Sequence, residues 1–303
     1  MTGTRTPSDW ALFVLLSTMW ASAFAFTKVA VAGLPAGVIV TGRLAIATAL
    51  MASIMVAQGH RLPSLANRPA WLTMLGIGTI GTMAPFYLIT VGQRTIDSAL
   101  AALLISAAPL FVAAMAHLRL ADERMTRQKA AGILVGFIGV AVLLGPDALG
   151  GIGEAGVVAQ LLCLGGAFCY AVNTIIAREA PALPATVLPT GFLGIATLAS
   201  LPAAFAEDWS MLDPDLNHVL AVVALGVVPS AAAGVVMIHL VRTTSATFLS
   251  LTGYLIPVLS AAIGYLAFGE TQHPSAGFAL ALILSGVWLA QRSPKAGTFP
   301  RSP

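Results

Sequence analysis

The chain contains ten long apolar runs that are almost free of charged side chains, and this pattern restricts the possible fold more than any other feature. A helix of about 20 apolar residues crosses the roughly 30 Å hydrocarbon core of a bilayer. The runs therefore predict an all-α polytopic membrane protein with ten transmembrane helices. We place these helices at residues 10–32, 36–57, 71–91, 98–118, 128–145, 155–177, 184–205, 217–241, 246–268 and 274–291.

The composition excludes several other classes of protein. Charged residues make up 9% of the chain and the mean hydropathy is +0.90, whereas a soluble domain has about 25% charged residues. A soluble enzyme, a disordered protein and a nucleic-acid-binding protein are therefore excluded. Cys163 and Cys169 lie in one helical run, about 9 Å apart along the axis, which is too far for a disulfide. We expect no metal or other cofactor, and a lipid bilayer and a small-molecule substrate as partners.

The distribution of basic residues predicts the orientation of the spans. If the N-terminus is cytoplasmic, inner segments hold twelve of the fifteen Lys and Arg residues, and the outer loops hold only Arg94. Cytoplasmic loops of membrane proteins carry such an excess of positive charge. We therefore expect a multi-pass protein of the inner membrane with both tails, residues 1–9 and 292–303, in the cytoplasm.

Two halves of the sequence repeat at an offset of 147 to 148 residues. The segment Arg94-Thr95-Ile96-Asp97-Ser98-Ala99 matches Arg242-Thr243-Thr244-Ser245-Ala246, and each precedes a span with an interior proline, Pro109 or Pro257. Five spans per repeat is an odd number, so the halves cross the membrane in opposite directions. Inverted repeats of this kind occur in secondary transporters, whose sites lie near the midplane. The predicted repeats are residues 10–145 and 155–291.

At these positions the chain resembles the EamA-like branch of the drug/metabolite transporter superfamily, and within it the YddG-type amino-acid exporters. The resemblance implies ten helices around a central cavity, and export of amino acids, including aromatic ones, and of related metabolites. In span ten, Gly277 and Gly286 are spaced more widely than the family's glycine pair in span five. The residues that carry the resemblance are Trp20-Ala-Ser-Ala-Phe24, Lys28, Arg43, Pro109 with Glu123, Pro257 with Glu270, and Gly132 with Gly139.

Two basic residues lie inside predicted spans. Lys28 is about 27 Å along the first span, so we expect its ammonium to reach the outer headgroups by snorkelling. Arg43 lies about 11 Å below the outer surface, where snorkelling is harder. Two roles stay open for Arg43, a structural bond to neighbouring helix groups and contact with a substrate carboxylate.

Polar and aromatic residues spaced by three or four positions suggest helix faces that line a cavity, although the same pattern is typical of packing. Asn173 stands out, because a buried amide needs hydrogen-bond partners. The candidate cavity residues are Trp20, Phe24, Arg43, Thr82, Phe86, Tyr87, Ser106, Tyr170, Asn173, Ser250 and Tyr254.

Four further features of the sequence concern packing and motion. Pro109 and Pro257 each free a backbone carbonyl and are either fixed kinks or hinges. Gly132 and Gly136 form a close-packing motif for a helix pair. His239, near the inner end of span eight, is either an interfacial residue or a proton relay.

Acidic residues are absent from the interior of the predicted spans. Proton-coupled antiporters usually need an intramembrane carboxylate or histidine. We therefore expect facilitated rather than proton-driven transport. Glu123 and Glu270 stand at helix ends, where we expect each to organise the start of the following helix.

Three alternatives compete with an amino-acid exporter. A sugar-phosphate or nucleotide-sugar exchanger needs several basic residues around phosphates, and the spans offer only Lys28 and Arg43. An integral membrane enzyme needs a nucleophile–base pair, paired carboxylates or metal ligands, and no span carries such a set. A channel needs a filter-like repeat or a ring of charges, and the sequence has neither. The oligomeric state stays open.

Overall fold

The computed structural model of this protein describes residues 6–119, 126–144, 155–207, 214–243, 252–271 and 274–291. Within these residues the chain is helical and has no strand, which confirms the all-α class. The helices are α1 (Pro7–Ala30), α2 (Ala36–Ala57), α3 (Arg68–Gly78), η1 (Thr79–Met83), α4 (Ala84–Gly92), α5 (Ser98–Ile105), α6 (Ala108–Arg119), α7 (Arg127–Leu144), α9 (Ala155–Arg178), α10 (Val187–Phe205), α11 (Leu216–Leu225), η3 (Gly226–Ala232), α12 (Ala233–Thr243), α14 (Thr252–Phe268) and α15 (Pro274–Gln291).

The surface of this helical bundle is apolar, as expected for a protein in lipid. In the described part of the chain, seven helical stretches are long and apolar enough to cross a membrane, and two shorter apolar helices cover Leu255–Phe268 and Ser275–Leu289. Large apolar side chains point outward, among them Leu118 at 81% and Leu266 at 82% exposure. Exposed apolar patches of this extent mark a lipid-facing surface, so the protein is an integral, multi-pass membrane protein.

Two of the predicted spans contain a π-helical segment, which the sequence analysis did not anticipate. Span three runs through α3, η1 and α4, and span eight through α11, η3 and α12. Proline has no N–H, so Pro85 and Pro229 leave the carbonyls of Gly81 and Leu225 without their α-helical donors. Single π-turns in α-helices often occur at functional sites. The two segments begin 147 residues apart, at Thr79 and Gly226.

The span that contains Pro109 is divided into two helices. Helix α5 ends at Ile105, Ser106 bonds back to the carbonyls of α5, and α6 begins at Ala108. Pro109 therefore lies in the first turn of α6, where the missing N–H is harmless. The sequence predicted a fixed kink or a hinge at Pro109, and the structure has a break in the helix two to three residues earlier. Pro257 lies inside α14.

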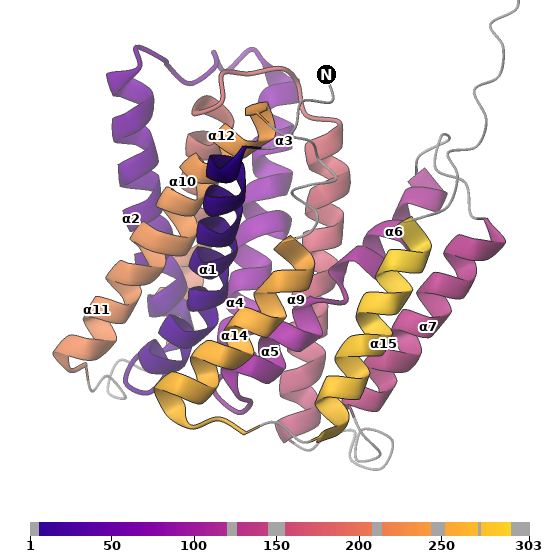
Figure 1. Cartoon of the computed structure of the whole chain (residues 1–303). Coiled ribbons are helices and arrows are strands. Elements are labelled where there is room, and N and C mark those ends of the chain that lie inside the picture. Colours follow the sequence, from indigo (N-terminus) through magenta and orange to yellow (C-terminus); the bar gives the residue numbers. More distant parts are fainter. Residues whose placement is uncertain are drawn as a thin grey trace, which may run out of the picture.

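Helices α7 and α15 pack side by side at one edge of the molecule, next to α6 (Figure 1). A Cβ added to Gly286 of α15 would touch the backbone of Gly132 and Gly136 on α7, so no larger residue fits there. A Cβ added to Gly139 of α7 would in turn meet the backbone of Ala279 and Ile283 on α15, at 2.9 and 2.8 Å. The predicted close-packing role of Gly132 and Gly136 is confirmed.

Helices α2 and α10 pack against each other, and α2 lies at the opposite edge of the bundle (Figure 1). The Thr48 and Thr197 hydroxyls share a hydrogen bond of 2.9 Å, and an apolar cluster that includes Leu44, Ala47 and Ala196 fills the contact. Helix α1 packs against α11, α12 and α14, while α9 packs against η1, α4, α5 and α6. The first helix of each predicted repeat therefore lies among helices of the other repeat.

Candidate functional site

Arg43 on α2 carries a guanidinium inside the bundle. The residue is 5% exposed, and its Nη2 donates to the Ser230 hydroxyl at 3.1 Å. The Cζ atom lies 3.8 Å from the centre of the Phe86 ring on α4, which is a cation–π contact. The buried Nε has no hydrogen-bond partner, and none of the carboxylates in the described residues pairs with Arg43.

Helix α9 supplies two more polar groups close to this site. Tyr170 lies near the Arg43 guanidinium. Asn173 follows one turn later, and its side chain is half-buried against η1. The contact is close, since a Cβ added to Gly81 would lie 2.5 Å from Asn173 Oδ1. Within the described residues, this Oδ1 atom is buried without a hydrogen-bond partner. Four predicted cavity residues, Arg43, Phe86, Tyr170 and Asn173, are thus brought into one region beside the two π-helices.

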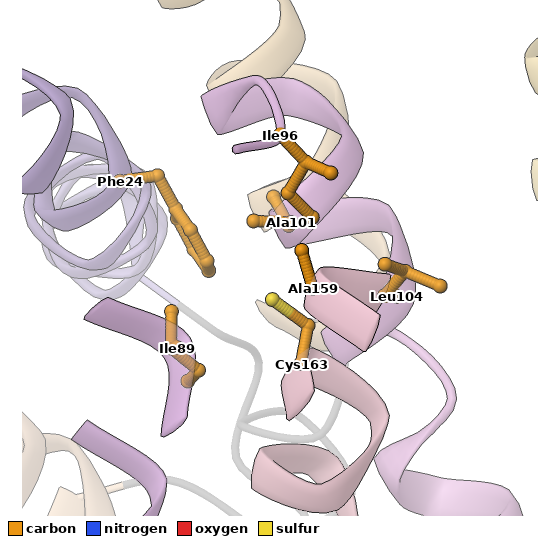
Figure 2. Packing of buried hydrophobic residues seen from close by; sticks show 8 residues of the cluster. Phe24, Ile89, Ile96, Ala101, Leu104, Ala159 and Cys163 are labelled. Atoms are coloured by element: carbon orange, nitrogen blue, oxygen red, sulfur yellow. The ribbon is translucent and has the colours of Figure 1, made fainter. Parts of the chain in front are cut away.

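Phe24 lies in a hydrophobic cluster (Figure 2). It is 8% exposed and shares this cluster with Ile89, Ala159 and Cys163, while Tyr170 packs on its border. Trp20, one turn earlier on α1, packs against a separate cluster around Leu16 and Leu240. The structure therefore places both aromatic residues of this predicted α1 face among packed apolar side chains.

The remaining predicted cavity residues are spread over several elements. Thr82 is buried within η1, and Tyr87 packs beside Phe86 against the cluster between α2 and α10. The buried Ser106 hydroxyl donates to the Leu103 carbonyl at 2.5 Å, as hydroxyls in helices often do. Ser250 lies outside the described residues, and Tyr254 is described only as a position in α14.

His239 does not join the Arg43 region. Its side chain is exposed near the end of α12, within electrostatic reach of Asp9 at the start of α1. In the described part of the chain, no three His, Cys, Asp or Glu side chains gather into a group that could hold a metal ion.

Lys28, the other cation within a span, forms ion pairs near the end of α1, which the snorkelling prediction did not include. Its Nζ lies 2.6 Å from Asp97 Oδ1 and 2.5 Å from Glu270 Oε1. It also lies 5.6 Å from the centre of the Phe268 ring. Two carboxylates hold the ammonium because α1, the start of α5 and the end of α14 converge here, which the sequence of one span does not reveal.

Glu270 organises α5 rather than the helix that follows it. Its Oε2 accepts from the Ser98 hydroxyl at 2.8 Å and from the Ala99 N–H at 3.2 Å, and its Oε1 accepts from the Ser98 N–H. A carboxylate at a helix N-terminus is stabilised by the unpaired N–H groups and the helix dipole. Gly269, at φ 66°, ends α14 and turns the chain so that Glu270 faces α5. The predicted role at the start of span ten is therefore wrong, and the corresponding Glu123 lies outside the described residues.

The residue that sequence reasoning missed is Ser230 in η3. Its hydroxyl accepts from Arg43 and donates to the Leu225 carbonyl at 2.8 Å. The available signal was the pair Pro229-Ser230, a proline inside an apolar span followed by a hydroxyl that can bond the carbonyl that the proline leaves free.

Comparisons with known proteins place the chain in a family. The profile of the EamA-like transporter family matches residues 9–145 and 157–291. A protein of Streptantibioticus cattleyicolor named "Probable terminal-alkyne amino-acid exporter" is 28% identical, with 93% of each chain covered. The S-adenosylmethionine/S-adenosylhomocysteine transporter of Chlamydia trachomatis serovar L2 is 25% identical, covering 92% of this chain and 88% of the relative.

A solved crystal structure shares the fold. Its chain is 24% identical, the two match with a TM-score of 0.66, and the match covers 94% of this chain and 97% of the other. The two profile matches together span most of the sequence. This protein belongs to the EamA-like transporter family.

Proposed function

We propose that this protein exports α-amino acids and related small metabolites across the cytoplasmic membrane by alternating access. The observation that carries this proposal is the buried Arg43 guanidinium, which has an aromatic ring and a hydroxyl as neighbours but no carboxylate among the described residues. A buried charge without an opposite charge is costly. A substrate carboxylate would supply that charge.

The chemistry of Arg43 favours a carboxylate over other anions. The planar guanidinium can form two parallel hydrogen bonds with one carboxylate. Two relatives are named for amino-acid export and for S-adenosylmethionine transport, and both kinds of molecule carry an α-amino-acid group. We therefore propose that Arg43 binds the carboxylate that such substrates have in common.

The proposed architecture has ten spans in two inverted repeats, residues 10–145 and 155–291, around a central cavity, with both termini in the cytoplasm. Three observations support the repeat. The π-helices begin 147 residues apart, the glycines Gly139 and Gly286 at the α7–α15 contact have the same offset, and each meets the partner helix in the same way. A fusion of alkaline phosphatase to the C-terminus should be inactive, and high phosphatase activity would contradict this orientation.

We propose that transport is facilitated, so that the substrate's own concentration gradient drives it. In the described residues the acidic side chains lie at helix ends, and the buried one, Glu270, is bonded to Lys28 and to the start of α5. The same pairing weakens the alternative of a phosphate-carrying substrate. Such a substrate needs several free basic groups, and Lys28 already has two carboxylate partners.

Export from liposomes tests this function directly. Purified protein should release L-amino acids that are preloaded in the vesicles, measured with a panel of amino acids and with sugar phosphates as the alternative cargo. An imposed pH gradient should not drive accumulation against the substrate gradient. Release of sugar phosphates without amino acids would refute the substrate class, and uphill accumulation that a protonophore abolishes would refute the facilitated mechanism.

A further inference from the structure

We infer that Ser230 is a positioning residue, which fixes the Arg43 guanidinium in the orientation that recognises a substrate carboxylate. This inference rests on the proposed function of Arg43 and extends it to the π-helix η3. It explains why a proline and a π-turn occur in the middle of span eight, directly opposite the cation on α2.

The first step of the argument is the effect of Pro229 on its own helix. In an α-helix the N–H of residue 229 would donate to the Leu225 carbonyl, but proline has no N–H. In the π-helix η3, residue 230, five positions on, faces this carbonyl, and the Ser230 hydroxyl donates to it at 2.8 Å. The hydroxyl hydrogen of Ser230 is therefore directed to the Leu225 carbonyl.

The second step follows from the chemistry of a hydroxyl group, which has one hydrogen and two lone pairs. Because the hydrogen points to Leu225, only lone pairs remain for Arg43. The Arg43 Nη2 atom donates to the Ser230 oxygen at 3.1 Å. With its hydrogen directed to Leu225, Ser230 acts as an acceptor toward Arg43, which as a guanidinium can only donate.

The third step concerns the orientation of the guanidinium. The Phe86 ring lies against its face, with 3.8 Å between Cζ and the ring centre, and Ser230 holds one edge. These contacts come from α4 and η3, so the group is held from two different elements. The Nε edge keeps its hydrogen-bonding capacity, because Nε has no partner. A guanidinium fixed before binding loses less conformational entropy when a carboxylate binds.

A matched control exists on α10. The Ser200 hydroxyl donates to the Thr197 carbonyl of its own helix at 2.7 Å and accepts from Thr41 of α2 at 2.9 Å. It is buried at 1% exposure. Ser200 therefore has the same bonding pattern as Ser230, with one partner on its own helix and one on α2, but its α2 partner is an uncharged hydroxyl.

The experiment measures ligand-dependent thermal stabilisation of purified variants, with a panel of L-amino acids and, in parallel, their decarboxylated amines. For the amino acids that stabilise the wild type, Ser230→Ala should raise the apparent Kd about tenfold, the equivalent of one lost hydrogen bond to a charged group. The Kd for the amines should change much less. Ser230→Thr, which keeps the hydroxyl, should restore binding, and Ser200→Ala should leave the preference for amino acids over amines intact.

A double variant separates positioning from general weakening. If Ser230 acts through Arg43, adding Ser230→Ala to Arg43→Gln should cause no further loss of amino-acid binding. Suppose that Arg43→Gln abolishes the preference for amino acids over amines. The inference is then overturned if Ser230→Ala keeps the wild-type preference, or if it weakens the binding of amines and amino acids equally. If no amino acid stabilises the wild type, or if Arg43→Gln keeps the preference, the proposed function of Arg43 itself is wrong.

Discussion

The two cations that lie inside the spans, Lys28 and Arg43, have opposite environments. Lys28 contacts two carboxylates, and one of these, Glu270, is also held by the start of α5. Arg43 contacts a ring and a hydroxyl, and its Nε has no partner. The side chain of Lys28 is 31% exposed, whereas Arg43 as a whole residue is 5% exposed.

This difference separates a structural charge from a charge that is available to a ligand. In an ion pair each charge is neutralised by its partner within the protein. Removing one partner leaves the other charge buried and unpaired, which destabilises the fold. An uncompensated buried cation is costly to the fold itself. The comparison therefore predicts that loss of Lys28 reduces stability, and that loss of Arg43 reduces substrate binding.

The largest expected effect on stability comes from Lys28→Met. The variant should lose about 3 kcal/mol of unfolding free energy, because the Glu270 side chain, 2% exposed, remains charged without its cation. Thermal unfolding in detergent measures the loss. Lys28→Arg keeps the charge and serves as the control. A loss no greater than that of a surface substitution would remove the distinction between the two cations.

The next effect concerns Arg43→Gln, which should weaken amino-acid binding by roughly 10- to 100-fold, as expected for the loss of a charge-assisted hydrogen bond. The stability of the ligand-free protein should change by less than about 1 kcal/mol or increase, because a desolvated charge is removed. Arg43→Lys should not restore binding, since an ammonium lacks the planar fork. Substrate-dependent thermal stabilisation reports both quantities in one series.

Two results would break the comparison at this residue. If Arg43→Gln destabilises the ligand-free protein as much as Lys28→Met does, then Arg43 is structural in the same sense. If amino-acid binding survives unchanged, the carboxylate contact is wrong.

The sequence was sufficient for features that depend on local pattern. Apolar runs predicted the helical membrane class, and spacing predicted the contact of Gly132 and Gly136 with a partner helix, because close helix packing needs small residues at regular intervals. Depth within a span singled out Arg43. These properties follow from residues close together in the chain.

The parts that could not be predicted depend on partners distant in the sequence. Lys28 meets Glu270 across 242 positions and Arg43 meets Ser230 across 187, and no local pattern encodes such pairs. The snorkelling prediction for Lys28 therefore used only the helix it belongs to. The π-helices depend on a proline together with tertiary packing that accepts the extra residue, so a proline alone predicts a kink without specifying its form.

The smallest expected effect is the pH dependence of the Lys28 contact, which sharpens the comparison by isolating its carboxylate. Burial alone would raise the pKa of the Glu270 carboxyl, but the hydrogen bonds from Lys28, Ser98 and Ala99 outweigh burial and hold this pKa below its ordinary value of 4.5. A pKa that is lower in the folded protein favours the charged form there. The resulting stability is present above the unfolded pKa and is lost as the pH falls through the folded one.

The wild type should therefore be more stable than Glu270→Gln by about 1 kcal/mol between about pH 5 and pH 8, and this gap should close in more acidic solution. Thermal unfolding of both proteins across this range gives the difference in stability. Arg43→Gln serves as the reference, because this substitution also introduces a glutamine but removes no carboxylate. A gap that persists well below the ordinary pKa would mean that the shape of Glu270, rather than its charge, holds the start of α5. A gap that opens only at alkaline pH would contradict the assigned ion pair, because Lys28 is already charged at neutral pH and would gain nothing there.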